Sequence, residues 1–265
     1  FNIKVGIWTS SKKERGQITV GTHALLVSYE SKKQVGFVVV DEQHRFGVAQ
    51  RGKMFLKQEK TLTPHLLTMT ATPIPRTLAL TIYGDLDLSV LDESPKGRQK
   101  IATFVVPNKK RQAAYNFIEK EIKNGRQAFI ITPFVEPSET MATVKSATVE
   151  FEKLKSHFTK SIKLGLLHGR LKSKDKEKII NDFKSNTINI LVSTPVVEVG
   201  IDVPNATIMM VESADRFGLA ALHQLRGRVG RGKHKSYCLL FTDSNFPNSQ
   251  ERLKSMEKIH VGFEL

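Results

Sequence analysis

The segment Phe37-Val38-Val39-Val40-Asp41-Glu42-Gln43-His44-Arg45-Phe46-Gly47 gives the clearest indication of the fold, because an apolar run leads directly into two adjacent carboxylates. Such a run is typical of a strand in a parallel sheet, and the carboxyl ends of these strands line the crevice where open α/β sheets bind ligands. Asp41 could hold Mg²⁺ on a nucleotide, and Glu42 could polarise an attacking water. For a bare Asp-Glu pair, the plain alternative is a solvated strand end.

Further short apolar runs predict strands on both sides of this segment. Besides 37–40, they lie at 65–69, 128–131, 164–167, 188–192, 208–211 and 237–241. Residues 144–158 and 115–122 carry apolar side chains at helical spacing. Strands that alternate with helices predict an α/β fold with mainly parallel sheets flanked by helices.

The residues Asp92 to Arg98 look like a linker, since apolar periodicity stops there and Pro95 and Gly97 occur close together. We place a domain boundary in this segment, which predicts one domain over 1–95 and a second over 96–265. A chain of 265 residues is long enough for two medium-sized cores.

Charge favours an anionic partner. Lys and Arg number 41 against 26 Asp and Glu, for a net charge of +15, and both halves share the excess. This distribution suits a surface that lies along a polyanion, although a protein that is merely basic is the alternative. The single cysteine, Cys238, excludes an internal disulfide and predicts a buried strand thiol in a reducing compartment. No apolar stretch approaches the roughly 20 residues of a membrane span, so we expect a cytoplasmic protein with no membrane partner.

Four motifs occur in the order in which superfamily 2 helicases carry them: Asp41 to His44, Thr70 to Pro73, Val197 to Asp202 and Gln224 to Arg231. With longer strings such as YGDLDLSVLDESP and ADRFGLAALHQLRGRVGR, the chain resembles the helicase core of the RecG family of ATP-dependent DNA helicases along nearly its whole length. The resemblance implies two tandem RecA-like lobes, the first incomplete, with ATP and Mg²⁺ bound between them and DNA lying across both. It also implies that a monomeric enzyme remodels branched DNA, such as replication forks and Holliday junctions, in recombination and repair.

The resemblance further implies catalytic roles for matching residues. Asp41 would coordinate Mg²⁺ through water, and Glu42 would be the general base. In the second lobe, Gln224 would sense the γ-phosphate, while Gly200 and Asp202 would face the nucleotide. Arg228 and Arg231 would stabilise charge on the transferred phosphoryl group. The alternative for both arginines is contact with DNA phosphates.

Two other groups of residues have implied roles. Coupling of hydrolysis to movement would involve Gln43, His44, Thr70, Ala71 and Thr72. Contacts with DNA would involve Thr9, Ser10, Gly21, Thr22, His168, Gly169, Arg170, Ser193 and Thr194. Small residues and hydroxyls let backbone amides approach phosphates, although each of these segments alone is more often a plain turn. Trp8 follows the alternating apolar residues Ile3, Val5 and Ile7 and is expected in the core.

The chain departs from the family at two points. No phosphate-binding loop GxxxxGK[ST] precedes Asp41, and the near match at Gly227 to His234 lacks the hydroxyl and does not follow a predicted strand. We infer that the loop lies upstream of Phe1 in a longer protein and that this chain alone is not competent as an ATPase. Only Ser11 to Val20 intervene where the family has room for a helix. Two alternatives stay open: a double-stranded DNA translocase resembling the transcription-repair coupling factor Mfd, and a DNA-binding module without catalysis.

Overall fold

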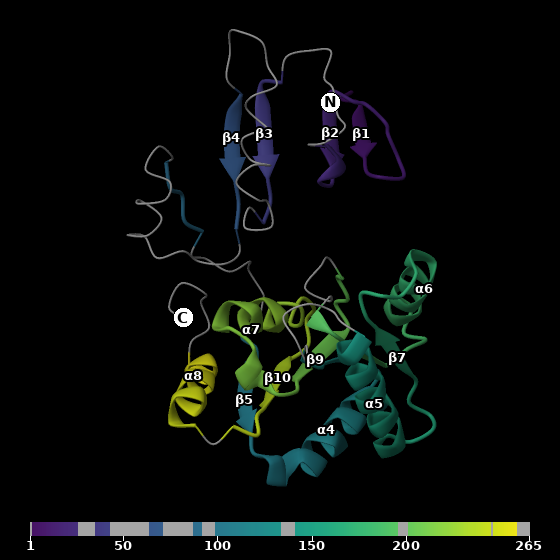
Figure 1. Cartoon of the computed structure of the whole chain (residues 1–265), viewed down its shortest axis with the longest axis vertical. Helices are drawn as coiled ribbons and strands as arrows, with labels where there is room; N and C mark the ends of the chain where they lie inside the picture. The colour runs from purple at the N-terminus through teal and green to yellow at the C-terminus, as the bar shows by residue number, and fades with distance from the viewer. Residues whose placement is uncertain are drawn as a thin grey trace. The chain divides into compact units, whose positions relative to one another are not determined.

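The computed structural model describes residues 2–25, 35–42, 64–70, 87–91, 99–133, 141–195, 201–244 and 246–258, leaving out the side chains of 141–146. The chain divides into two compact units, Phe1–Ala71 (unit 1) and Thr72–Leu265 (unit 2), and each is described by itself (Figure 1). The boundary predicted between residues 95 and 96 stays a prediction, because residues 92–98 lie outside the described residues.

Unit 1 contains two parallel strand pairs (Figure 1). β1 (Val5–Trp8) pairs with β2 (Ile18–Gly21), and β3 (Phe37–Val40) pairs with β4 (His65–Thr68). The register sets Trp8 beside Gly21 and Val40 beside Thr68, so the carboxyl ends of each pair are level. The strands predicted over 37–40 and 65–69 are confirmed as β3 and β4.

The connection from β1 to β2, residues 9–17, is unusually short. Parallel strands ordinarily need a crossover of about a dozen or more residues, often a helix. Here the chain runs back along β1, where the Glu14 N–H donates to the Ile7 carbonyl over 2.8 Å and the Gln17 N–H donates to the Lys4 carbonyl over 2.8 Å. A Cβ on Gly6 would lie 2.6 Å from the carbonyl carbon of Arg15, so only glycine allows this approach.

Unit 2 is built on a six-stranded sheet in the order β5-β10-β9-β6-β8-β7, in which all pairs are parallel (Figure 1). The strands are β5 (Ala102–Val106), β6 (Gln127–Ile131), β7 (Leu164–Leu167), β8 (Ile190–Ser193), β9 (Ala206–Val211) and β10 (Tyr237–Phe241). The five strands predicted between residues 128 and 241 are confirmed, with ends that differ by up to two residues.

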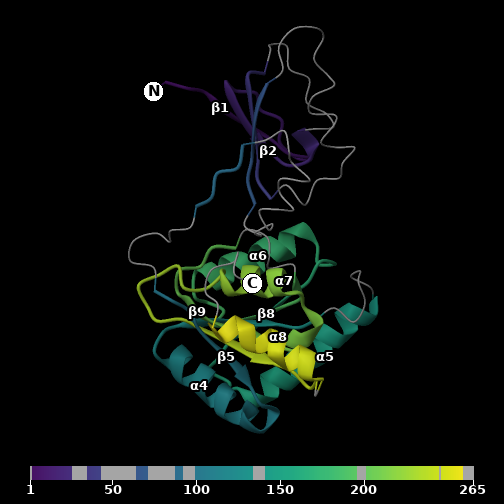
Figure 2. The same ribbon diagram turned by 90° about the vertical axis from the view of Figure 1, so that its left-hand side faces the viewer.

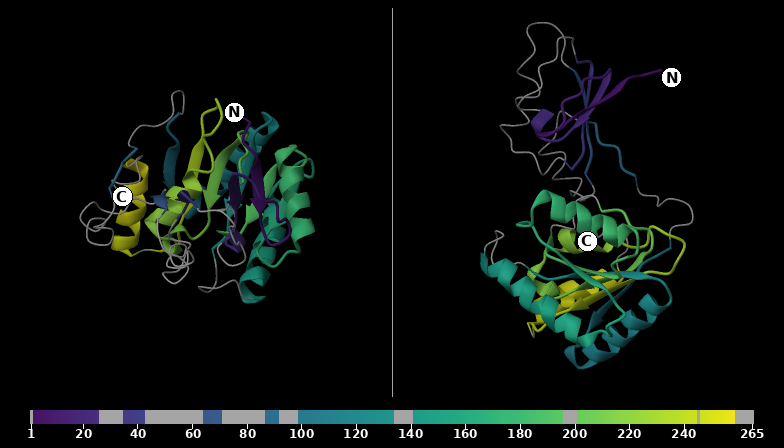
Figure 3. Two further views of the ribbon diagram at one scale, coloured as in Figure 1. Left: turned by 90° about the horizontal axis from the view of Figure 1, so that it is seen from above. Right: turned by 90° about the vertical axis from the view of Figure 1, so that its right-hand side faces the viewer.

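Helices cover both faces of this sheet (Figure 2; Figure 3). Side chains of α4 (Arg111–Lys123) and α5 (Met141–His157) pack on one face. Those of α6 (Ser173–Lys184), α7 (Leu219–Arg226) and α8 (Pro247–Lys258) pack on the other. The helices predicted over 115–122 and 144–158 correspond to α4 and α5. In the part of the chain that the structure describes, no helix combines the length and apolar character needed to cross a bilayer.

The core of unit 2 alternates between the two faces along each central strand. Phe129 and Ile131 of β6 join the cluster under α6, α7 and α8, whereas Ala128 and Ile130 join the cluster under α4 and α5. All residues of β6, β8 and β9 are buried, as expected for a parallel sheet covered on both sides. Cys238 in β10 is fully buried, which raises the pKa of its thiol to about 12 and confirms the predicted strand thiol.

Candidate functional site

The predicted catalytic carboxylates of unit 1 follow the carboxyl end of β3. Asp41 is exposed and Glu42 is half-buried. The next strand of the pair, β4, ends beside them, because the Met69 N–H donates to the Val40 carbonyl over 2.8 Å. Thr70, predicted to take part in coupling, therefore belongs to the same edge as the two carboxylates.

The backbone at Glu42 is strained. Its φ is 49°, in the left-handed region that residues other than glycine rarely adopt, and its N–H donates to Asp41 Oδ1 over 2.9 Å. Such a conformation costs on the order of 1–3 kcal/mol and is often found at functional sites. The strain therefore supports the interpretation of Asp41-Glu42 as more than a solvated strand end.

The donor set at Asp41 fits Mg²⁺ held largely through water. An exposed carboxylate is the hard oxygen ligand that Mg²⁺ takes, and Mg²⁺ usually keeps several waters and binds one or two carboxylates together with phosphates. Among the described residues, no group of three or more histidine, cysteine or acidic side chains could hold a metal by itself. Most ligands of a Mg²⁺ ion at Asp41 would thus be water and nucleotide phosphate oxygens.

The predicted DNA-contact residues of unit 1 lie at the carboxyl ends of the other strand pair. Thr9 and Ser10 follow β1, and Gly21 and Thr22 end and follow β2. The Thr22 N–H donates to the Trp8 carbonyl over 3.1 Å, which keeps the two strand ends together. Trp8 itself is 6% exposed, so the expectation that it belongs to the core is confirmed.

In unit 2, the structure brings together two of the residues predicted to face a nucleotide. Arg231 Nη1 donates to Asp202 Oδ1 over 3.1 Å, and Arg231 Nε donates to the Gly227 carbonyl over 3.2 Å. Both ion-pair partners are exposed, and such pairs contribute only about 0–1 kcal/mol. Arg231 can therefore leave Asp202 for another anion at little cost in stability. Gln224 on α7 and Arg228 in the following turn are half-buried.

Two glycines allow the conformation of the turn that carries Arg231. Gly230 has a φ of 75°, and a Cβ on Gly232 would lie 2.6 Å from the Pro204 carbonyl oxygen. The near match to a phosphate loop, Gly227 to His234, follows helix α7 and not a strand, in agreement with its rejection. Its glycines serve the close approach of this turn to the segment after Asp202.

Arg226 belongs to the same motif but has a different function. Its side chain is 3% exposed, Nη1 donates to the Met256 carbonyl over 2.9 Å, and Nη2 lies 2.9 Å from His223 Nδ1. Burial lowers the pKa of its guanidinium. Arg226 therefore joins α7 to α8, and the sequence pattern alone does not separate this arginine from its exposed neighbours.

The predicted DNA-contact residues of unit 2 lie at the ends of β7 and β8. His168, Gly169 and Arg170 follow β7, and Arg170 is exposed. The carbonyl of Gly169 accepts a hydrogen bond from the Lys176 ammonium, a residue for which the motifs give no signal.

The end of β8 differs, because Ser193 and Thr194 are fully buried and Ser193 Oγ donates to the Thr194 carbonyl over 2.6 Å. A DNA contact through these two hydroxyls stays a prediction that would need this strand end to open. Gln43, His44, Ala71, Thr72 and Gly200 lie outside the described residues.

An ion pair between a buried carboxylate and a half-buried arginine, near the carboxyl end of β9, was not indicated by any motif. Glu212 follows β9 and is 7% exposed; Arg111, the first residue of α4, donates to its carboxylate and also lies 4.5 Å from the centroid of the Phe241 ring. Burial raises the pKa of Glu212, and the Arg111 guanidinium opposes that shift. The pair connects the first turn of α4 to the loop that leads into α7.

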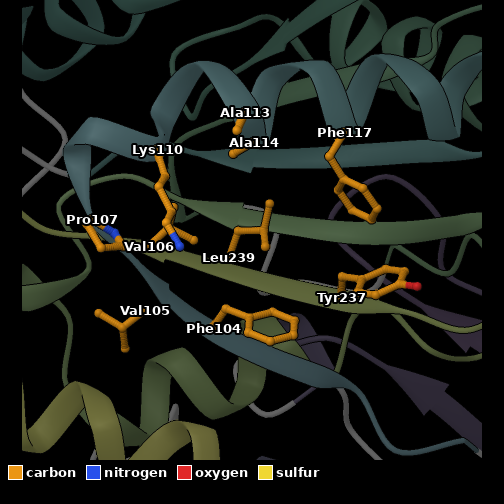
Figure 4. A pocket seen from close by; sticks show the side chains of 10 residues that line it. All are labelled: Phe104, Val105, Val106, Pro107, Lys110, Ala113, Ala114, Phe117, Tyr237 and Leu239. Atoms are coloured by element: carbon orange, nitrogen blue, oxygen red, sulfur yellow. The ribbon is translucent and has the colours of Figure 1, made fainter.

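Unit 2 also has an apolar pocket of about 420 Å³ between α4 and the strands β5 and β10 (Figure 4). Phe104, Phe117, Tyr237 and Leu239 line it, with Lys110 at one end (Figure 4). None of the predicted site residues lines this pocket.

Two protein families match separate parts of the chain and define the class of protein. A family described as DEAD/DEAH box helicase matches residues 6–81, and a family described as helicase conserved C-terminal domain matches residues 109–233. These two matches, in this order, define a pair of helicase domains with a RecA-like fold.

The relatives then specify the family. The chain is 51% identical to the ATP-dependent DNA helicase RecG of Synechocystis sp. over 93% of this chain and 29% of that protein. It is 48% identical to the RecG helicase of Bacillus subtilis over 100% of this chain and 40% of that protein; that alignment covers 278 residues, against 265 in this chain. The chain belongs to the RecG family of DNA helicases and spans less than half the length of these relatives.

A solved structure agrees with this assignment. The structure of RecG bound to a three-way DNA junction matches with a TM-score of 0.78 and 39% identity, over 100% of this chain and 35% of that chain. The RNA-bound Dbp5 of Saccharomyces cerevisiae matches with a TM-score of 0.66 at 20% identity, which shows a shared fold alone.

Proposed function

We propose that this chain is the motor core of an ATP-dependent DNA helicase or translocase that remodels branched DNA, such as forks and Holliday junctions, in recombination and repair. The observation that carries the proposal is the identity of 48% to a RecG helicase over 100% of the chain. The solved relative bound to a three-way junction supports branched DNA as the substrate. The monomeric state and the cytoplasmic location are part of the proposal, the latter supported by the single buried thiol.

In this proposal, residues of both units take part in ATP hydrolysis. Glu42 accepts a proton from the attacking water. Asp41 would hold Mg²⁺ through water, and the bound ion would neutralise charge on the phosphates. Arg231 transfers its guanidinium from Asp202 to the phosphoryl group, where charge develops in the transition state. Arg228 also stabilises charge on the phosphoryl group, and Gln224 senses the γ-phosphate. Gly200 and Asp202 face the nucleotide.

Movement and DNA binding complete the proposal. The residues proposed to couple hydrolysis to movement are Gln43, His44, Thr70, Ala71 and Thr72. The strand-end residues at 9–10, 21–22, 168–170 and 193–194 are proposed to contact the DNA backbone, which suits a motor that moves regardless of sequence. The domain boundary is proposed at residues 95/96. An Mfd-like translocase is less favoured, because the relatives described above are RecG helicases.

Glu42→Gln tests the proposal in a protein of the relatives' length that carries this chain as its motor. The change removes the base while preserving size, so ATP binding should remain and hydrolysis should slow by about two orders of magnitude or more. Arg231→Ala should likewise lower turnover at saturating DNA.

The competing assignment makes Arg231 a DNA contact. If Arg231→Ala weakened DNA binding, flattened its salt dependence and left turnover at saturating DNA unchanged, then this arginine would be a phosphate-backbone contact and the catalytic assignment would be wrong. Turnover must be measured at saturating DNA, since a DNA-stimulated motor is slow whenever it is unbound.

A further inference from the structure

The short connection between β1 and β2 concentrates positive charge. Within residues 9–17 it carries Lys12, Lys13 and Arg15 against one acid, Glu14, and all four side chains are exposed. Lys12 and Glu14 form an ion pair at 3.3 Å, and the loop as a whole carries three basic side chains against one acidic side chain. A basic loop on its own is often only a solvated surface. The conformation of the loop and the positions of its basic side chains decide whether it can bind an anion.

The loop is held in one conformation by its own hydrogen bonds. Thr9 Oγ1 accepts the N–H of Lys12 over 3.0 Å and that of Ser11 over 3.3 Å, and the Thr9 N–H donates to the Lys12 carbonyl over 2.7 Å. The glycine contact at Gly6 packs the returning backbone against β1. A loop already ordered in this way loses little conformational entropy when a ligand binds.

The buried ring of Trp8 brings the two cations together. Lys13 Nζ lies 5.9 Å and Arg15 Cζ 5.6 Å from the centroid of that ring. Trp8 is 6% exposed, so the ring can serve as a platform for the two charged groups but offers no face for stacking a base. Lys13 and Arg15 are therefore held at one place on the surface, next to Thr9 and Ser10.

We propose that Lys13 and Arg15, positioned by Trp8 and by the Thr9 turn, form a binding site for nucleic-acid backbone phosphates. This inference rests on the proposed function and names a contact surface of unit 1. Arg can bind a phosphate through two parallel N–H groups, and Lys binds it as a compact charge. Contacts of this kind position a strand without reading its sequence.

The experiment measures binding of this chain to fluorescent duplex and single-stranded DNA by anisotropy at several salt concentrations. Lys13→Gln with Arg15→Gln should weaken duplex binding by about tenfold or more and reduce the slope of log affinity against log salt by about two, since each lost phosphate contact removes roughly 0.9 from the slope. The matched control is Lys120→Gln with Lys123→Gln, which removes two exposed lysines of α4 and should leave the slope nearly unchanged. A smaller loss of slope on single strands than on duplex would still support the site, because single strands release fewer counterions per contact.

Two further variants keep the inference testable if the neutral double variant does not fold. Lys13→Arg with Arg15→Lys retains both charges and should retain the slope. Glu14→Gln removes the only acid of the loop and should tighten binding and steepen the slope. Two results would overturn the inference while the proposed function stands. In the first, Lys13→Gln with Arg15→Gln lowers the slope no more than the control Lys120→Gln with Lys123→Gln. In the second, Lys13→Gln with Arg15→Gln leaves the slope unchanged although the unsubstituted chain binds DNA. A parent chain with no affinity for DNA would instead count against the proposed function itself.

Discussion

Among single residues, Arg111 offers the most direct test of the packing of unit 2. Arg111→Met keeps an apolar side chain against Phe241 but leaves the Glu212 carboxylate buried without its partner. We expect the free energy of unfolding at pH 7.5 to fall by about 3 kcal/mol, because an uncompensated buried charge is costly. Urea unfolding followed by circular dichroism measures the loss.

The same variant makes stability depend on pH in a defined direction. Burial raises the pKa of Glu212 in the folded chain. The folded state therefore binds a proton at Glu212 more tightly than the unfolded state does, and this stabilises the fold at low pH. That contribution is fully present below the ordinary carboxyl pKa and is lost as the pH rises through the raised pKa of the folded state. Without Arg111, which opposes the shift, this dependence should grow. Arg111→Met should therefore destabilise less at pH 5 than at pH 7.5, and adding Glu212→Gln should abolish the difference. An equal loss at both pH values would contradict the assignment.

The family resemblance predicted which residues share a site, but it gave no information on how deeply each side chain is buried. The resemblance assigns Asp202 and Arg231 to one site, and the structure joins the two residues in an ion pair, while their roles stay predictions. It does not separate Arg226 from Arg231, because only burial and the carbonyl of Met256 distinguish the structural arginine from the exposed one. Nor does it reveal that Ser193 and Thr194 are buried, because the sequence of a motif does not show whether a hydroxyl side chain is buried or exposed.

At the level of elements, the close approach between β1 and the connection that follows it can be tested by substituting a glycine of β1. Gly6→Ala places a Cβ 2.6 Å from the carbonyl carbon of Arg15, which is backbone and cannot move aside cheaply. We expect a loss of about 2 kcal/mol or more in the stability of unit 1, as strain in a tightly packed site costs typically 1–3 kcal/mol. Hydrogen exchange of β1 and β2 reports it.

Gly36→Ala is the matched control in the same unit. A Cβ at Gly36 would meet nothing within 4 Å, so this change should be neutral or slightly stabilising. If Gly6→Ala and Gly36→Ala behaved alike, the close backbone approach would not be what holds the short connection.

All of the fully buried strands were predicted, but only some of the strands with exposed side chains were. β6, β8 and β9 are buried on both faces and appear as continuous apolar runs, the pattern that indicates a strand most clearly. No predicted run covered β1, β2 or β5, which have exposed side chains such as Val5, Val20 and Phe104.

Helices α6, α7 and α8 of unit 2 also escaped prediction, and for α6 and α8 the reason is a sparse apolar stripe. The described side chains of α6 include one buried residue, Phe183, and those of α8 include two, Leu253 and Met256. An apolar stripe this sparse does not stand out from a charged surface segment.

On the scale of the whole molecule, the two units should differ in local stability. Among the described residues of unit 1, most apolar side chains of β1 to β4 are exposed, including Val5, Ile18, Val20, Phe37 and Val39. Hydrogen exchange should therefore be faster in β1 to β4 than in β6, β8 and β9. Equal protection in the two sets of strands would show that unit 1 is more stable than its exposed side chains indicate.

Catalysis by the chain as a whole gives a further prediction. No GxxxxGK[ST] sequence occurs in it, so the purified chain should release negligible phosphate from ATP even with DNA and Mg²⁺. A coupled phosphate assay measures the rate. Steady DNA-stimulated release would mean that another segment binds the phosphates, and Gly227 to His234 would be the first to reconsider.

The burial of Cys238 has a practical consequence for following the motion of such a motor. It is the only cysteine of the chain, it has no exposed surface, and its pKa is raised to about 12, so little reactive thiolate forms at neutral pH. Maleimide dyes should therefore react with cysteines introduced at exposed positions and spare the native one. One dye on each unit would then allow single-molecule energy transfer to record whether the distance between the units changes when this chain binds DNA, with the native thiol left in place.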